Sequence, residues 1–354
     1  MNSAGDEAMG AQLGSLYRDA FLPRIPYYGK VTCCHSQTLL SAYLPPACPL
    51  DLMTFELLTT VPFGLLSVPE DPNRLLTCYL DPDLGLDRAL MVLGLNYEVC
   101  AWPPGTDGRE ALTTLITWVH EGPVVLGPLN MEALSYLFHP ELLYACDHYI
   151  VVQGIERDRF RICDTEGYIT VYLTHDQLMA AWRGDLIPEG RGEFVLRRVK
   201  NSWRLPDRSQ LWLRTLPYVV QNLNGAQEHE RGGAAAYAAL AESSDRFEAN
   251  PSAWRGLTFV IPTRMQRLVF QEYWFRESHR LLVGIESGDM VDGILSLITK
   301  EIQILSEVLA GVMERKTETL VLFRVAAELE EQLTESCLRY LSLINQAHSS
   351  SISN

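Results

Sequence analysis

Three side chains in this sequence have the types and the order that thiol-based acyl chemistry needs. The cysteine pair Cys33 and Cys34 directly precedes a predicted helix at residues 36–43. His148 opens an apolar run that predicts a strand, and Asp164 ends the next such run. A cysteine reacts as its thiolate, which a helix N-terminus and a nearby imidazolium stabilise, and a carboxylate can orient that imidazole. The order Cys, His, Asp therefore favours a cysteine nucleophile with a histidine base.

Each of these residues also has a purely structural interpretation. Buried cysteines usually pack as small hydrophobic side chains. His148 could be a core histidine bonded to a backbone carbonyl, and Asp164 could cap the turn that follows its strand. The residues alone leave open which of Cys33 and Cys34 would be the nucleophile. We expect His35, which follows the pair, to point away from the same cleft.

Zinc binding is the rival use of the same residue types. Six soft ligands are available, namely Cys33, Cys34, His35, Cys146, His148 and Cys163. The C-x-x-C spacing of structural zinc sites is absent, so the pattern disfavours a metal. We therefore predict no metal and no bound cofactor.

The elements that would position the three residues form a mixed set of helices and strands. Periodicity and turn residues predict strands at 97–102, 124–129, 149–153, 159–163, 168–173 and 192–199, with an extended segment at 210–215. They predict helices at 12–21, 36–43, 88–95, 109–120 and 174–182, the last with Thr174 and Gln177 as a capping box. Residues 54–66 and 75–80 are ambiguous. The first half is therefore predicted to be α+β.

The second half of the chain changes character after a polar stretch at 222–233, which we interpret as a linker. Helical spacing follows at 234–247, 264–282, 290–310 and 317–346, and the tail 349–354 is predicted to be disordered. We predict two domains, a catalytic one at about 20–220 and an all-α bundle at about 230–346. The bundle would form a wall on the acceptor side or mediate self-association.

Composition limits the class of protein. The chain has 354 residues, 47% hydrophobic and 21% charged, which is typical of a globular protein with a sizeable core. No apolar run is long enough for a membrane helix, and the first residues have no signal-peptide pattern. A net charge of -15 argues against nucleic acid as a partner. We expect a cytoplasmic protein whose eight cysteines are free thiols.

One stretch departs from the acidic average. Between residues 191 and 214, seven basic residues stand against two acidic ones. The plainer interpretation is a solvated face. The functional one is a docking patch for an acidic partner, with Arg197, Arg198, Lys200 and Arg204 as its centre and with activity that falls as salt rises.

Several segments resemble the butirosin biosynthesis protein H family. The likeness to its N-terminal domain runs through GPVVLGPL (122–129), LSY (134–136), DHYIVVQG (147–154), ICD (162–164) and the ends of 173–182. The second half resembles the domain that usually follows, most visibly at GGAAAYAAL (232–240). The family's N-terminal domain is similar to C39-type and papain-like cysteine peptidases. Its cysteine stands two positions before a hydroxyl residue, which matches Cys34 and Ser36.

The resemblance implies a fold and an activity. The fold would be a papain-like N-terminal domain followed by a helical domain, with Cys34, His148 and Asp164 as the catalytic triad. The activity would be acyl transfer in bacterial natural-product biosynthesis. The acyl or aminoacyl group would come from a thioester on an acyl or peptidyl carrier protein, whose 4'-phosphopantetheine belongs to that partner, and would go to an amine of a small molecule.

The chain also departs from the resemblance. C39-like peptidases carry a glutamine shortly before the cysteine that helps to bind the oxyanion, and residues 26–30 contain none. The donors would then be the N–H of Cys34 and a second group for which Tyr28 is the candidate. A hydrolase (peptidase, amidase or thioesterase) and a non-catalytic carrier-binding protein are the alternatives.

Overall fold

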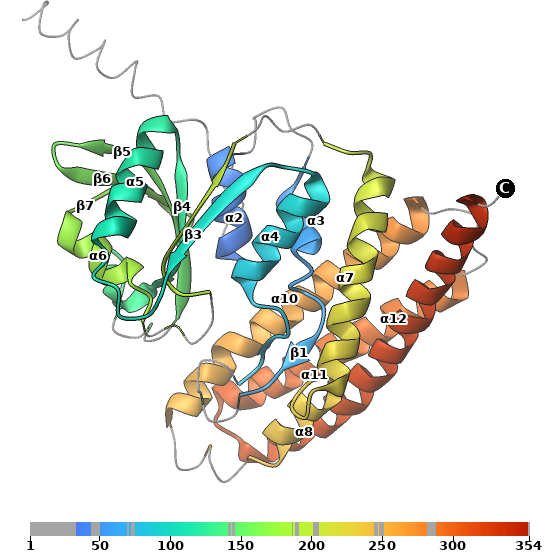
Figure 1. The fold of residues 1–354 in the computed structure, drawn as a ribbon. Coiled ribbons are helices and arrows are strands. Elements are labelled where there is room, and N and C mark those ends of the chain that lie inside the picture. The colour runs from blue at the N-terminus through green and yellow to red at the C-terminus, as the bar shows by residue number, and fades with distance from the viewer. Residues whose placement is uncertain are drawn as a thin grey trace, which may run out of the picture.

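The structure is a computed structural model that describes residues 33–43, 50–68, 71, 75–140, 143, 146–185, 187, 191–200, 205–243, 247, 251–281 and 288–352. A six-stranded antiparallel sheet with its covering helices forms one side, and long helices from the second half of the chain form the other (Figure 1). The predicted mixed α and β character is confirmed. None of the helices within the described ranges is long and apolar enough to cross a membrane.

The sheet carries His148 and Asp164, the two candidate site residues that were predicted to lie on strands. Its order is β3 (Tyr97–Trp102), β8 (Glu193–Val199), β4 (Val124–Asn130), β5 (Asp147–Glu156), β6 (Arg159–Asp164) and β7 (Tyr168–Leu173). All neighbouring pairs are antiparallel. A tight turn with Arg157 and Asp158 at positive φ joins β5 to β6, as favoured two-residue hairpin turns require. This hairpin brings the start of β5 beside the end of β6. Two short strands, β1 (Leu65–Leu66) and β2 (Thr77–Cys78), pair separately.

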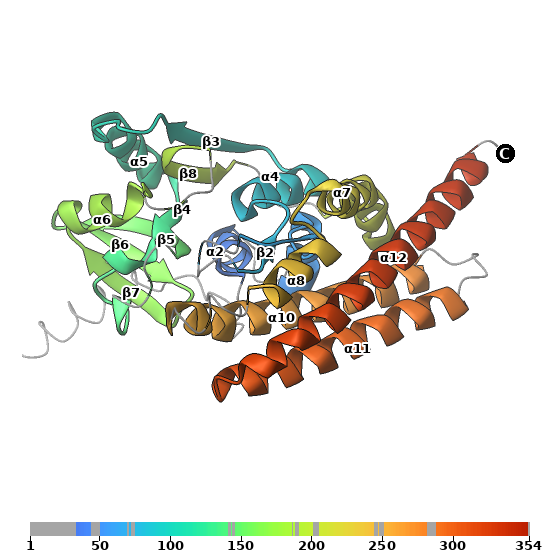
Figure 2. The same cartoon turned by 90° about the horizontal axis from the view of Figure 1, so that it is seen from below.

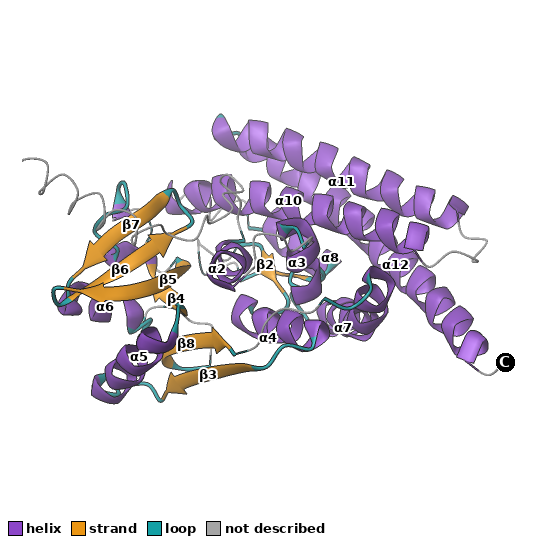
Figure 3. Cartoon of the chain, turned by 90° about the horizontal axis from the view of Figure 1, so that it is seen from above, coloured by secondary structure: helices purple, strands orange, loops and turns teal. Residues whose placement is uncertain are grey.

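Helices cover both faces of the sheet. On one face α5 (Arg109–Glu121) and α6 (His175–Trp182) pack against residues such as Leu126 and Ile150. The predicted capping box at the start of α6 is present. On the other face α2 (Cys34–Tyr43) packs against Val125 and Tyr149. In two views along the sheet, α2 lies between the strands and the C-terminal helices (Figure 2 and Figure 3).

The burial of α2 is nearly complete. Residues 35–41 are all buried, and α3 (Leu52–Thr59) and α4 (Pro82–Leu93) complete its surroundings. The Thr38 hydroxyl donates to the carbonyl of Tyr149 at 3.0 Å, and the Tyr43 hydroxyl donates to that of Pro123 at 2.6 Å. Because an unpaired buried hydroxyl is costly, these bonds hold the helix in register with β5 and β4. Helix α4 begins six residues before its predicted start, where Asp81 caps Asp83 and proline occupies the first turn.

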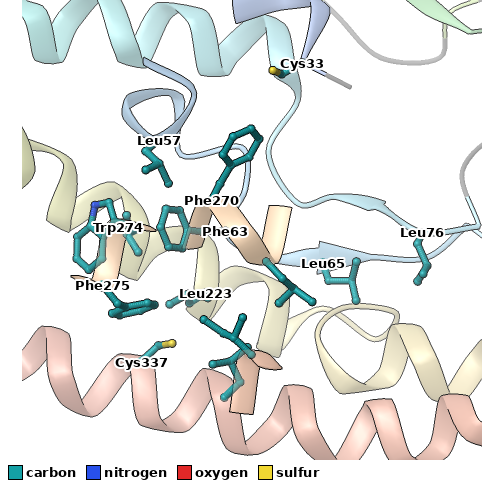
Figure 4. Packing of buried hydrophobic residues seen from close by; sticks show 14 of the residues in the cluster. Cys33, Leu57, Phe63, Leu65, Leu76, Leu223, Phe270, Trp274, Phe275 and Cys337 are labelled. Carbon is teal, nitrogen blue, oxygen red and sulfur yellow. The ribbon is translucent and has the colours of Figure 1, made fainter. Parts of the chain in front are cut away.

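The helical half consists of α7 (Arg208–Glu228), α8 (Ala234–Ala241), α10 (Pro251–Leu281), α11 (Gly288–Met313), the short helix η3 (Thr317–Val321) and α12 (Leu322–Ile352). A three-residue 3₁₀ turn, η1 (Met131–Ala133), lies in the other half. One apolar cluster joins the two halves, from Cys33 through Phe63 and Trp274 to Cys337 (Figure 4). The N-terminal helices and the C-terminal helices therefore share one core.

Three sequence predictions for this half are wrong. Residues 210–215 are helical, and the predicted linker at 222–233 begins inside α7, where Asn222 and Leu223 are buried. The Asn222 side chain donates to the carbonyl of Thr60 at 2.9 Å and accepts from Arg88 at 2.7 Å, so a polar composition hides a packed helix. The tail stays helical to Ile352. The predicted helix at 12–21 lies outside the described residues.

A buried polar network ties the long helices together. Arg264 of α10 donates to Glu301 of α11 at 2.9 Å and to Glu330 of α12 at 2.5 Å. Tyr237 of α8 donates to Glu301 at 2.7 Å. One guanidinium thus faces two carboxyl groups. Burial raises the pKa of Glu330 to about 8, more than the charge of Arg264 lowers it. The network therefore holds a proton at neutral pH.

We predict that Glu330→Gln flattens the pH dependence of stability. The unfolded carboxyl has a pKa of about 4.3, so the folded protein binds the additional proton between that pH and about 8. Wild-type stability should then fall as pH rises through this window, by roughly 2–4 kcal/mol. The variant should lose most of this fall and be the more stable protein at pH 8, as measured by urea denaturation at pH 5 and pH 8.

Glu331→Gln is the matched control, because Glu331 is exposed on the same helix. It should keep the wild-type slope. An equal slope in wild type and Glu330→Gln would contradict the interpretation of the network.

Candidate active site

Cys34 occupies the first turn of α2. The carbonyl of Cys33 accepts the backbone N–H of Gln37 at 3.0 Å, so the helix begins at the cysteine pair, as predicted. The first N–H groups of a helix have no acceptor within it, and the positive end of its dipole lies there. Cys34 as a whole residue is half-buried at this end.

The structure brings His148 and Asp164 together with this thiol. His148 Nε2 lies 2.9 Å from Asp164 Oδ1, and the two residues are 1% and 2% exposed. His148 also acts on the Cys34 thiol, whose pKa it lowers. With Nε2 directed at the carboxylate, Nδ1 is the ring nitrogen left for the sulfur. The three residues predicted from their order in the chain therefore meet at one place.

Two further groups hold the Asp164 carboxylate. The Tyr136 hydroxyl donates to Oδ2 at 2.6 Å, and the backbone N–H of Glu166 donates to Oδ1 at 2.8 Å. The first of these contacts was missed in the sequence analysis, although Tyr136 belongs to one of the segments that carry the resemblance. The second is the turn cap that was considered for Asp164. Asp164 therefore caps the turn and also contacts His148, so the two interpretations of this residue do not exclude each other.

Electrostatics at the site favour the ion pair of a thiolate and an imidazolium. Burial raises the pKa of Cys34, but hydrogen bonds from His148 and His35 and the charge of His148 outweigh it and lower the pKa. Burial lowers the pKa of His148, but the charge and hydrogen bond of Asp164 raise it well above the ordinary value. Burial raises the pKa of Asp164, and the His148 charge more than reverses this.

Cys33 has a different environment from its neighbour. It is 1% exposed and belongs to the apolar core that the two halves share. Burial raises its pKa well above the ordinary value, and the charge of Glu56 raises it further. Of the two cysteines, Cys34 therefore has the surroundings that favour a thiolate.

His35 does not point away from the site, and that expectation was wrong. Its Nε2 lies 2.9 Å from Glu56 Oε2 of α3, and its ring is in hydrogen-bond contact with Cys34. Glu56 also accepts from the Ser36 hydroxyl at 2.6 Å. Sequence reasoning overlooked Glu56, because a single acid in an apolar helix gives no sign of the residue it will face.

A close approach of two strands supports the position of His148. Gly127 in β4 has a φ of +147°, and a Cβ at this position would lie 2.7 Å from the carbonyl oxygen of His148 and 2.4 Å from the Tyr149 ring. The β4–β5 register shifts between Leu126 and Leu129, opposite this point. A glycine is therefore required where β4 passes the start of β5.

The basic stretch is not the free positive patch that its composition indicated. Arg197 is fully buried and pairs with Asp83 and Asp87 of α4 at 2.8 Å each, so its proposed role in docking a partner is wrong. Arg191 pairs with the same two acids.

The other residues of the proposed docking patch either form ion pairs or lie outside the described residues. Arg198 pairs with Glu98 at 2.7 Å and Glu121 at 2.6 Å, and Lys200 pairs with Glu98. These acids offset most of the positive charge and remove the basis for a strong salt dependence. A docking role for Arg198 and Lys200 stays a prediction. Arg204 and Tyr28 lie outside the described residues.

Metal ligands do not gather anywhere in the part of the chain that the structure describes: no group of three or more His, Cys, Asp or Glu side chains could hold an ion there. In particular, Cys33 and Cys163 are buried, and Cys33 belongs to the apolar core that the two halves share. Soft ligands are present in number, but their arrangement is not that of a zinc site.

Comparison with known proteins gives one partial relative. The chain is 31% identical over 137 residues to the uncharacterized protein YobF of Bacillus subtilis (strain 168). The match covers 39% of this chain and 43% of the relative, so the chain spans less than half the length of that protein. No protein-family model matches the chain.

The thiol environments predict selective labelling. Iodoacetamide at pH 7 should modify Cys34 at least tenfold faster than Cys33, because the lowered pKa of Cys34 raises its thiolate fraction while burial raises the pKa of Cys33 and shields it from the reagent. Fragment-ion mass spectrometry separates the neighbouring sites. Cys33→Ser should keep the fast site and Cys34→Ser should lose it. The opposite pattern would assign the reactive thiol to Cys33.

Proposed function

We propose that this protein is a cysteine-dependent acyltransferase that moves an acyl or aminoacyl group from a carrier-protein thioester to an amine. The observation that carries the proposal is the line of contacts from Cys34 through His148 to Asp164 at the N-terminus of α2. A papain-like arrangement is part of the proposal. Its support is a helix-borne thiol packed against an antiparallel sheet that presents the histidine and the aspartate.

The first half-reaction forms an acyl-enzyme. The Cys34 thiolate attacks the thioester carbonyl, and the N–H groups at the start of α2 stabilise the developing oxyanion. The intermediate collapses with loss of the carrier thiol, which takes its proton from His148. Exchange of one thioester for another is nearly balanced in free energy, so a thiol is a suitable nucleophile for this step.

The second half-reaction makes the product. A cationic acceptor first releases one proton to solvent, and the free amine attacks the Cys34 thioester while neutral His148 takes the proton that the attacking nitrogen loses. Collapse breaks the carbon–sulfur bond and regenerates the thiolate beside the protonated imidazole. Asp164 holds the His148 ring in one orientation during both proton transfers, with Tyr136 and the Glu166 N–H fixing the carboxylate.

Acidic groups beside the thiol support a cationic acceptor. Asp147 is half-buried next to His148, and its charge raises the pKa of Cys34, which opposes thiolate formation. The charges of Asp147 and Asp71 also reach Cys146. Negative charge that disfavours the nucleophile has a use if the second substrate is a protonated amine, which it would attract and position.

Acylation by simple thioesters tests the proposal directly. The protein is mixed with acyl thioesters of N-acetylcysteamine, which mimic the carrier's thiol arm, and its intact mass is measured. We expect one acyl group on wild type and on Cys33→Ala and none on Cys34→Ala. Added amines should then discharge the acyl-enzyme as amides.

Other outcomes separate the alternatives. Rapid discharge to the free acid without amine would identify a hydrolase. No adduct on any variant, with carrier-bound thioesters as donors as well, would leave a binding role and contradict the proposal.

Asp147→Asn should affect the two half-reactions differently. Loss of its charge should raise the KM for a charged amine about five- to tenfold, equivalent to ~1 kcal/mol. Acylation should be as fast or faster, because the variant removes a charge that raises the pKa of Cys34. Steady-state kinetics with a charged and a neutral acceptor measure this. Asp158→Asn, at the exposed turn between β5 and β6, is the control and should change neither step. Equal effects on both acceptors would contradict the role of Asp147.

A further inference from the structure

We propose that His35, held by Glu56, is a second imidazolium that keeps Cys34 ionised whether or not His148 carries its proton. The inference rests on the proposed role of Cys34 as nucleophile. In this account His35 and Glu56 place a positive charge beside the sulfur of Cys34. His148 alone transfers protons.

The contacts of His35 are those of a fixed side chain. It is 4% exposed, and its Nε2 lies 2.9 Å from Glu56 Oε2. The edge of its ring meets Tyr149 of β5, with ring centroids 5.9 Å apart. Ser36 donates to the same Glu56 oxygen at 2.6 Å, so the carboxylate is itself held in place. The imidazole thus lies between α3 and β5, on the residue that follows Cys34 in the chain.

The charges of the two histidines have different fates. Burial lowers the pKa of His35, but the Glu56 charge and the contact with Cys34 raise it to about 10. At neutral pH His35 therefore keeps its proton and cannot serve as a base. His148 must lose and regain its proton in each cycle of the proposed reaction. Of the two histidines, His35 is the one that offers the sulfur a positive charge throughout the cycle.

The surroundings explain why a second cation is needed. Burial and Asp147 both oppose ionisation of Cys34, and Glu56 opposes that of Cys33 next to it. The charged and titratable groups that face this region, besides the two histidines, are Cys33, Glu56, Asp71, Asp81, Asp83, Cys146, Asp147, Tyr149, Asp164, Arg197 and Arg267. Acids predominate among them. A protonated His35 offsets Glu56 and stabilises the thiolate.

The consequence concerns the leaving group in the second half-reaction. When the tetrahedral adduct collapses, either the amine or the Cys34 sulfur can depart. A thiol of lower pKa leaves faster. A permanent charge on His35 keeps the sulfur the better leaving group even before His148 has taken the amine's proton. The pair of His35 and Glu56 therefore favours loss of the sulfur, which forms the amide product, over loss of the amine, which restores the acyl-enzyme.

The pH dependence of Cys34 alkylation tests this inference without any acyl donor. Full-length protein is treated with iodoacetamide between pH 4 and pH 10, and labelling of Cys34 is followed by mass. In His35→Asn the inflection should move to higher pH, with a rate at pH 6 at least tenfold below wild type and a plateau at high pH close to it. Glu56→Gln should shift the profile in the same direction.

The variant His148→Asn provides the contrast. It should retain a thiolate at neutral pH and alkylate within about tenfold of wild type, yet lose acyl transfer. Ser36→Ala removes one hydrogen bond that holds Glu56 and should shift the profile in the same direction as Glu56→Gln, by a smaller amount. A merely structural role for His35 would lower the rate at every pH equally.

Two results would overturn the inference. One is an alkylation profile whose inflection pH is unchanged in folded His35→Asn. If His35→Asn does not fold, the same result in Glu56→Gln, which keeps the shape of the side chain, would overturn the inference. The other is an ordinary thiol profile in His148→Asn. Failure of the thioester experiment would refute the proposed acyl transfer. It would not refute the role of His35, which the alkylation profile tests independently.

Discussion

The position of the reactive sulfur depends on the burial of α2 between the sheet and the helical half. The helix is bonded to β5 through Thr38 and to the β4 side through Tyr43, and its apolar residues Leu39 and Leu40 are fully buried. Its core continues without a break into the C-terminal helices. A helix enclosed in this way cannot shift without opening the core, so Cys34 meets β5 at one place. The helical half thus contributes to the site although it supplies no residue to the proposed triad.

Charge at the site follows one pattern. Each imidazole beside the sulfur lies 2.9 Å from a buried carboxylate, His148 from Asp164 and His35 from Glu56. A buried charge is costly unless an opposite charge is close to it. The same rule governs Arg197 among the acids of α4 and Arg264 among the acids of the long helices. Most buried charges therefore hold elements together, whereas those at Cys34 surround a group that could react.

Local signals made part of this predictable from the sequence. The strands that carry His148 and Asp164 are apolar runs joined by a short turn, and the thiol precedes a short helix that two prolines end. Partners distant in the chain could not be predicted. Glu56 belongs to an otherwise apolar helix, Asn222 to a polar run that resembles a linker, and Arg197 to a basic stretch that resembles a solvated face. In each case a polar residue is buried because tertiary structure supplies its partner, which local pattern does not encode.

The protonation of the two histidine rings tests the central claim most directly. Nitrogen-resolved NMR of ring-labelled histidine at pH 7, assigned with His35→Asn and His148→Asn, reports whether each ring carries one proton or two. The account predicts two protons on both rings in wild type, and two on His35 in Cys34→Ala as well, because Glu56 remains. Singly protonated rings at both positions in wild type would mean that Cys34 is a neutral thiol at rest, and a singly protonated His35 ring alone would contradict its role as a constant positive charge.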